Sequence, residues 1–91
     1  MTGINDPKAS SFVVYPVPNN GMFKLMMNSQ SAGSFDISIC NTVGVTIYTK
    51  QNVEVKGSQE LMIDLRPIPA GVYTMIIRNG ETKVVRKIIV N

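Results

Sequence analysis

The sequence contains no histidine and no tryptophan, and only one of its 91 residues is a cysteine. Without histidine, no imidazole can act as a catalytic base, and a Cys/His zinc site is excluded. A single cysteine also excludes a disulfide within the chain. No apolar run approaches the roughly 20 residues that a membrane-spanning helix needs, and no signal-peptide pattern opens the chain. Export would therefore require a leader upstream.

Charged residues are scarce as well, at 16% of the chain against 44% hydrophobic residues, a balance that excludes a disordered tail and indicates one small folded domain. The net charge of +3 arises in residues 66–91, where Arg66, Arg78, Lys83, Arg86 and Lys87 face Glu81 alone. These basic residues are scattered among Val and Ile, without the aromatic-flanked cluster typical of a phosphate-binding surface. No nucleic-acid partner is predicted.

Short apolar stretches separated by turn residues recur about every ten positions, which is typical of an antiparallel β-protein. Residues 1–11 have little to bury and are predicted to be a linker or cloning remnant, so the domain spans residues 12–91. The predicted strands are residues 12–15, 22–27, 35–40, 45–50, 58–65, 72–78 and 82–90. Residues 28–34 are expected as a polar loop, and residues 51–57 as a short edge strand or an extended loop. The fold class predicted is all-β, a seven-stranded antiparallel immunoglobulin-like β-sandwich.

Several local signals refine this prediction. Pro16 and Pro18 remove two ladder donors, so the first strand must end there or lie at an edge. Residues 58–65 also fit a short helix, although the alternation of Leu61, Ile63 and Leu65 favours a strand. Asn79-Gly80 predicts a type I′ hairpin turn. The last strand is apolar on both faces, which predicts a central position or a covered end.

No catalytic or cofactor-binding group is predicted. The six acidic residues lie on different predicted loops and strands, with no spacing that suggests a carboxylate pair (Asp6, Asp36, Glu54, Glu60, Asp64 and Glu81). Serine and threonine are numerous but have no histidine base, and no glycine-rich phosphate loop is present. Cys40 is expected to be a small buried hydrophobic residue. The sequence therefore indicates a non-enzyme.

Three segments resemble the motifs of a known family. Residues 15–21, Tyr-Pro-Val-Pro-Asn-Asn-Gly, are similar to a Tyr-Pro-Asn-Pro-x-x-Gly opening motif, with Val17 where the family commonly has Asn. Gly44 with Tyr48 resembles its Gly-x-x-Val-Tyr hairpin, and residues 65–73 resemble its Leu-x-x-Leu-Pro-x-Gly-x-Tyr segment. The family is the type A C-terminal sorting domain of the Bacteroidetes type IX (Por) secretion system. Matched to its motifs, the recognition residues are Pro16, Pro18, Asn19, Gly21, Gly44, Tyr48, Leu65, Pro69, Gly71, Tyr73, Arg86, Lys87, Ile88 and Val90.

The resemblance implies a non-catalytic secretion signal carried at the end of a larger cargo protein. Its partners would be the type IX translocon, an outer-membrane shuttle and a sortase-like C-terminal signal peptidase that cuts in or before residues 1–11. The implied location is the periplasm in transit, and then the cell surface or the medium.

Two other functions stay open at this point. An immunoglobulin- or fibronectin-like binding module would present an exposed aromatic platform, yet most aromatic residues alternate inward (Phe12, Tyr15, Phe23, Phe35, Tyr48 and Tyr73). A spacer would require no particular C-terminal sequence. The segment that carries Val53 and Val55 also makes an edge-strand homodimer plausible.

Overall fold

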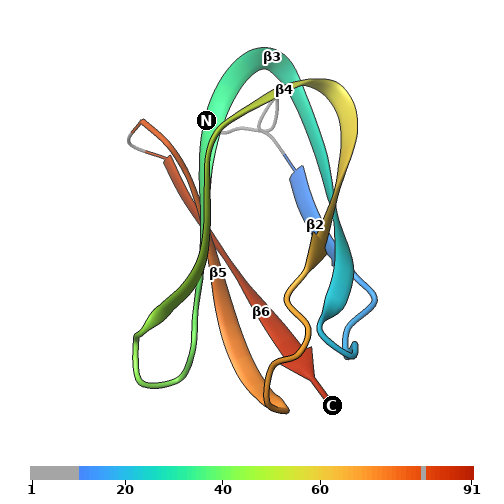
Figure 1. The fold of residues 1–91 in the computed structure, drawn as a ribbon. Coiled ribbons are helices and arrows are strands. Elements are labelled where there is room, and N and C mark those ends of the chain that lie inside the picture. Colours follow the sequence, from blue (N-terminus) through green and yellow to red (C-terminus); the bar gives the residue numbers. More distant parts are fainter. Residues whose placement is uncertain (1–10, 81) are drawn as a thin grey trace, which may run out of the picture.

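A computed structural model describes residues 11–80 and 82–91 and shows an all-β, antiparallel chain (Figure 1). Within these residues there are five strands and no helix, and hence no helix that could cross a membrane. The strands are β2 (Ser11–Tyr15), β3 (Met22–Cys40), β4 (Thr46–Asp64), β5 (Gly71–Asn79) and β6 (Thr82–Val90). The predicted linker lies outside the described residues except for Ser11, which opens β2.

The prediction of seven separate strands is wrong, because β3 and β4 each unite segments that were expected to be distinct. Residues 28–34 are not a loop but the middle of β3, and residues 51–57 are part of β4. The ladder between the two strands continues across three register shifts, between Ser29 and Gly33, Phe35 and Ile37, and Ile39 and Cys40. Such bulges let a strand bend without losing its partner, so polar residues there do not end it.

The result is a single bent sheet, and the predicted immunoglobulin-like sandwich is not confirmed. Its strand order is β2-β3-β5-β6, with β4 paired to β3 alone. We call the part formed by β2, residues 22–29 of β3 and residues 57–64 of β4 the first arm. The second arm contains the remaining halves of β3 and β4 with β5 and β6. The long strands arch over between the two arms, which face each other (Figure 1).

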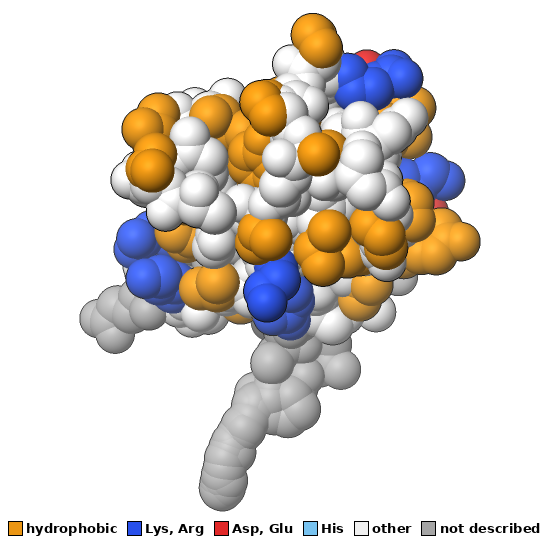
Figure 2. Space-filling view, turned by 90° about the horizontal axis from the view of Figure 1, so that it is seen from below, with side chains coloured by type: hydrophobic (Ala, Val, Ile, Leu, Met, Phe, Trp, Pro, Cys, Tyr) orange, Lys and Arg blue, Asp and Glu red, His pale blue; other side chains and the backbone are white. Residues whose placement is uncertain are grey.

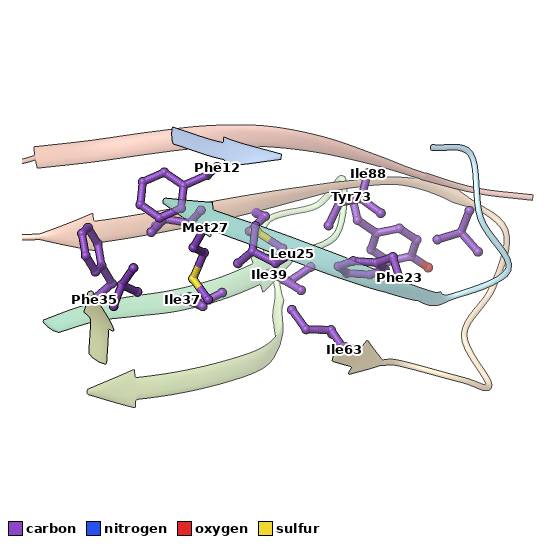
Figure 3. Packing of buried hydrophobic residues seen from close by; sticks show 14 residues of the cluster. Phe12, Phe23, Leu25, Met27, Phe35, Ile37, Ile39, Ile63, Tyr73 and Ile88 are labelled. Carbon is purple, nitrogen blue, oxygen red and sulfur yellow. The ribbon is translucent and has the colours of Figure 1, made fainter. Parts of the chain in front are cut away.

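The hydrophobic core lies between the arms (Figure 3). Period-2 alternation places its members, as the sequence predicts for residues 22–27 and 35–40. Phe12 of the first arm meets Phe35 of the second edge to face, with ring centroids 5.2 Å apart. The other fully buried hydrophobic side chains are Phe23, Leu25, Met27, Ile37, Ile39, Val55, Ile63, Tyr73, Met75, Ile77, Ile88 and Val90. Cys40 is only half-buried, because its position in β3 points to the outer side.

Both predicted hairpins form. Residues 37–40 pair with the start of β4, and β5 pairs with β6 along its whole length. The second turn differs from the prediction in register: Asn79 still pairs with Thr82, so the connection begins at Gly80 and not at Asn79. Gly80 has a φ of 57°, the left-handed conformation that glycine adopts without strain.

The strand predictions at the two ends of the domain are largely correct. β2 stops at Tyr15, before the two prolines, and lies at the edge of the sheet order. Residues 58–64 form a strand and not a helix. β6 is not central, because it ends the sheet order, but its last residues are covered: Val90 bridges in parallel to Asn19.

Ile88 and Ile89 offer a direct test of how the tail packs. Ile88 is fully buried, whereas its neighbour Ile89 is 38% exposed. We expect Ile88→Ala to lower the free energy of unfolding by about 2–5 kcal/mol. Ile89→Ala should cost about 1 kcal/mol or less, mainly through strand propensity. Urea unfolding measures both values, and equal losses would contradict the described docking of β6.

Candidate functional site

The proline-rich loop after β2 is organised by one asparagine. The Asn19 side chain is buried, with its amide donating to the carbonyl of Pro16 at 2.9 Å. Its Oδ1 accepts from the Gly21 N–H, also at 2.9 Å. Since both ends of the side chain are satisfied within the loop, Asn19 fixes the path of residues 16–21. A side-chain cap is thus present although Val17 stands at the family's usual asparagine.

The backbone of Asn19 holds the C-terminus of the chain. Its N–H donates to the carbonyl of Ile89, and its carbonyl accepts from the N–H of Asn91, both at 2.9 Å. We call these two hydrogen bonds the tail clasp. Because Ile88 and Val90 are buried on either side of Ile89, the clasp and the core together fix the last residues of β6. Chain ends usually fray unless they are docked in this way.

The segment after β4 packs against the same loop. The Leu65 N–H donates to the carbonyl of Gly21 at 2.8 Å, and the Tyr73 hydroxyl donates to the carbonyl of Pro69 at 2.7 Å. The Tyr73 ring is buried while its hydroxyl reaches the turn, as the sequence predicts. Gly71 pairs with Val90 at the end of the β5–β6 ladder. Two of the family's motif segments therefore meet at the tail.

The third motif lies at the same end of the molecule but apart from the clasp. Gly44 has a φ of 91° in the β3–β4 turn and donates its N–H to the Asn41 carbonyl at 3.0 Å. The Asn41 side chain, which the sequence did not single out, accepts from the N–H groups of Val43 and Val45. Tyr48 is half-buried against the core, and this burial raises the pKa of its hydroxyl.

We call the end of the molecule that carries residues 16–21, 41–45, 65–71 and 89–91 the C-terminal pole (Figure 1). Figure 2, seen from this end, shows hydrophobic side chains interspersed with Lys and Arg and little Asp or Glu between them. Five hydrophobic residues of the pole and its rim are exposed: Val17, Val43, Val45, Val72 and Ile89. The pole therefore offers an apolar surface to a partner, and Arg66 is the one basic residue in its four segments.

The structure divides the predicted recognition residues of the tail into three groups. Ile88 and Val90 are buried in the core, so a partner of the folded domain cannot touch them. Arg86 reaches across to β2, where its Nε donates to the Phe12 carbonyl at 2.9 Å, a contact that the sequence did not predict. Lys87 alone points to solvent.

An ion pair next to the pole was also missed by the sequence analysis. Asp64 accepts from Arg66 through both carboxylate oxygens, at 2.9 Å from Nε and 3.0 Å from the terminal nitrogen. Its Oδ1 accepts from the Arg66 backbone N–H as well, at 3.1 Å. These hydrogen bonds hold the pKa of Asp64 below its usual value of 3.8 and raise that of Arg66. The sequence signal for this ion pair was an acidic and a basic residue two positions apart, which lie on the same side of an extended segment.

The aromatic residues do not build a carbohydrate-binding platform. Phe12, Phe23, Phe35 and Tyr73 are buried and Tyr48 is half-buried, so Tyr15 is the one exposed ring of the six. Flat sugar-binding surfaces rely on exposed aromatic faces, and a single ring on an edge strand is a poor candidate.

A family model described as the secretion system C-terminal sorting domain matches residues 13–91. The chain belongs to this family. No curated protein matches the sequence. The sorting domain is the C-terminal signal for type IX secretion, and it directs export across the outer membrane to the cell surface or the medium. The family match covers all three motif segments and the tail that the clasp holds.

Gly21 tests the close packing of the sorting domain's motif loop. Gly21 and Gly44 have similar positive φ values, 104° and 91°, but a Cβ on Gly21 would lie 3.0 Å from the Arg66 Cγ, whereas nothing lies near Gly44. Both alanine substitutions should cost about 1–2 kcal/mol from backbone strain. Gly21→Ala should cost about 1 kcal/mol more, because Arg66 must shift away from Asp64. Chemical denaturation compares the two variants, and equal costs would contradict the close approach.

Acid should weaken the Asp64–Arg66 pair. In the unfolded chain Asp64 regains its ordinary pKa, so the pair stabilises the fold fully above that value and loses its effect as pH falls through the lower folded pKa. The wild-type domain should therefore lose more stability than Asp64→Asn between about pH 5 and about pH 2. Thermal unfolding across this range measures the difference, which should also shrink at high salt because the pair is exposed. Parallel pH profiles for the two proteins would show that the pair has no effect.

Proposed function

We propose that the type IX translocon and its outer-membrane shuttle recognise this domain in its folded form, at the C-terminal pole. The observation that carries the proposal is the tail clasp. Through Asn19 it joins the proline-rich motif to the last residues of the chain, and Gly21 joins the same loop to Leu65. Recognition elements that are far apart in the sequence thus become one surface only when the domain folds. In this role the domain is a signal that the machinery binds and transports, and it catalyses no reaction.

The resemblance also implies that a peptidase removes the domain by cutting the chain upstream of β2. The cargo would precede residue 1, and the described structure begins with β2, at Ser11, at the edge of the sheet order. A sortase-like cysteine peptidase needs an extended backbone in its cleft, which the predicted linker would supply. We propose cleavage in or before residues 1–11, after transit through the periplasm.

A fused reporter tests recognition. Residues 1–91 are attached to the C-terminus of a folded reporter with its own leader, in a bacterium that has a type IX system and in a matched strain without the translocon. We expect export only in the first strain. Asn19→Ala removes one buried and one partly buried hydrogen bond, each worth about 1 kcal/mol, and should reduce export several-fold. Asn20→Ala is the matched control, because its side chain makes a single exposed bond to Met22.

Truncation of the tail would not separate recognition from folding. Deleting residues 87–91 would remove two core side chains, so loss of export would report unfolding as well as loss of recognition. The thermal stability of each purified variant must therefore be measured beside its export. Export without the translocon would leave only a binding or spacer module. Undiminished export of a folded Asn19→Ala domain would contradict the proposed role of the loop that the Asn19 side chain shapes. Mass spectrometry of the exported reporter tests cleavage, which retention of residues 12–91 would contradict.

Pairing of two copies through β4 is a separate proposal. Within the described residues β4 pairs only with β3, so its other edge is open for a ladder. Val55 is buried and cannot contribute to an apolar contact, so pairing would depend on backbone hydrogen bonds. Asn52 and Gly57, with φ of 59° and 74°, mark irregularities of the kind that limit edge pairing. A monomeric mass in light scattering at high concentration would exclude this dimer.

A further inference from the structure

The outer side of the second arm carries an apolar and cationic surface that the core does not explain. Tyr73, Met75 and Ile77 point into the core, so the alternate residues of β5 point outward. The same alternation in β6 places the neighbours of Ile88 and Val90 outside. We call this surface the β5–β6 outer face; its residues are Val72, Thr74, Ile76, Arg78, Lys83, Val85, Lys87 and Ile89.

Cross-strand pairing groups these side chains in rows. Val72 lies opposite Ile89, and Ile76 lies opposite Val85. The exposed fractions of Val72, Val85 and Ile89 are 42%, 49% and 38%. Between the two apolar rows Lys87 faces Thr74, and beyond them Arg78 faces Lys83. Rows of half-exposed apolar side chains beside lysines are unfavourable in water and are typical of a surface that a partner covers.

Lys83 and Lys87 on this face form no ion pair within the described residues, whereas Arg78 has an acidic neighbour. Asp36, which pairs with Arg78 across the ladder, is the one acidic residue on the described outward positions of the neighbouring half of β3. Its carboxylate already accepts from the Asn52 N–H at 3.0 Å. On the outer side of the first arm, by contrast, Lys24 lies 3.8 Å from Glu60, and Arg66 is paired with Asp64. The β5–β6 outer face therefore carries three basic side chains, Arg78, Lys83 and Lys87, with Asp36 as the one acid on the described outward positions of the adjoining half of β3.

We infer that this face is a docking surface for an acidic protein surface with an apolar centre, presented by the secretion machinery. The inference rests on the proposed recognition of the folded domain and adds the face and the chemistry of the partner. Charge complementarity of this kind steers association, while the valine and isoleucine rows bury the apolar area that holds a complex together. Continuity with the pole supports it, since Ile89 belongs to both surfaces and Val72 lies at the rim of the pole.

Other occupants match the face less well. An anionic membrane is bound by side chains that penetrate the interface, commonly aromatic ones, whereas this face is a sheet of short aliphatic side chains without a single ring. A second copy of the chain would bring Lys83 and Lys87 against like charges. Nucleic acid would require stacking residues, which are absent from the described positions of this face.

Paired substitutions on the full chain fused to the reporter test the inference. Lys83→Glu with Lys87→Glu reverses the charge of the face, and Lys50→Glu with Lys56→Glu makes the same change in net charge on exposed positions of β4. Val85→Gln is matched by Val13→Gln, because these two residues are 49% and 51% exposed on edge strands. We expect about a tenfold loss of export for the Lys83/Lys87 pair and for Val85→Gln, and less than about twofold for the controls.

A photo-cross-linker at position 85, with position 13 as control, identifies the occupant. The expected result is a cross-link from position 85 to an acidic segment of an outer-membrane component of the type IX machinery. Normal export of both β5–β6 variants, when the unmodified fusion depends on the translocon, would overturn this inference and leave the proposed function intact. Failure of the unmodified fusion to be exported would overturn the proposed function itself.

Vesicles and size measurements decide between the remaining occupants. The 91-residue chain should not co-sediment with phosphatidylglycerol–phosphatidylcholine vesicles at physiological salt. Co-sedimentation that the Lys83/Lys87 reversal abolishes would replace the protein partner with a membrane. A dimer whose subunits cross-link to each other through position 85 would replace it with a second copy of the chain.

Discussion

The folded domain depends on the attachment of its last residues to the loop that follows its first strand. Asn19 makes this attachment with its backbone while its side chain shapes the loop, so that one residue serves two purposes. Among the described strands, β6 ends the sheet order and has β5 as its one ladder partner. Without the clasp, its buried end would be held only by the β5 ladder and by side-chain packing. A strand at the end of a chain is the part of a fold most prone to fray, and the clasp removes that weakness.

The bent sheet explains how so short a chain encloses a core. A domain of this size buries a limited share of its surface, and without a disulfide in the chain it must rely on packing. By arching β3 and β4 from one arm to the other, the chain builds two facing layers from a single continuous ladder. The contact between Phe12 and Phe35 closes the core between them. The Arg86 contact with the Phe12 carbonyl then ties β6 to β2, where the sheet order leaves both strands unpaired on one side.

The tail therefore has two sides with separate tasks. Its inner side chains stabilise the domain, and its outer ones remain available to a partner. Under the proposed recognition of the folded domain, the signal would be read only after folding, since unfolding separates the proline-rich loop, the segment around Tyr73 and the C-terminus. The physical advantage is that a single folded state presents several distant segments at once, which a linear signal of the same composition would not do.

Features that depend on local interactions were predictable from the sequence, whereas features that depend on pairing between distant segments were not. Alternation placed Phe23, Leu25 and Met27 on one inner face, because side-chain period in a strand is a local property. Proline ended β2 for a local reason as well, the loss of a backbone donor. The same reasoning failed at residues 28–34, where polar composition suggested a loop but pairing with β4 keeps the backbone in the ladder. Bulges that bend a paired strand leave only a weak trace in a single sequence.

The motif residues show the same division. Their order and spacing identified the family, since each motif is a short run of turn and strand residues. That Asn19 would hold Ile89 and Asn91, or that Arg86 would reach Phe12, was not visible in any local pattern. These contacts join residues about seventy positions apart in the chain. The sequence by itself determined the class of fold, the inner faces of the strands and the family; the tertiary structure decided which motif residues share a surface, because only closure of the bent sheet brings the two ends of the domain together.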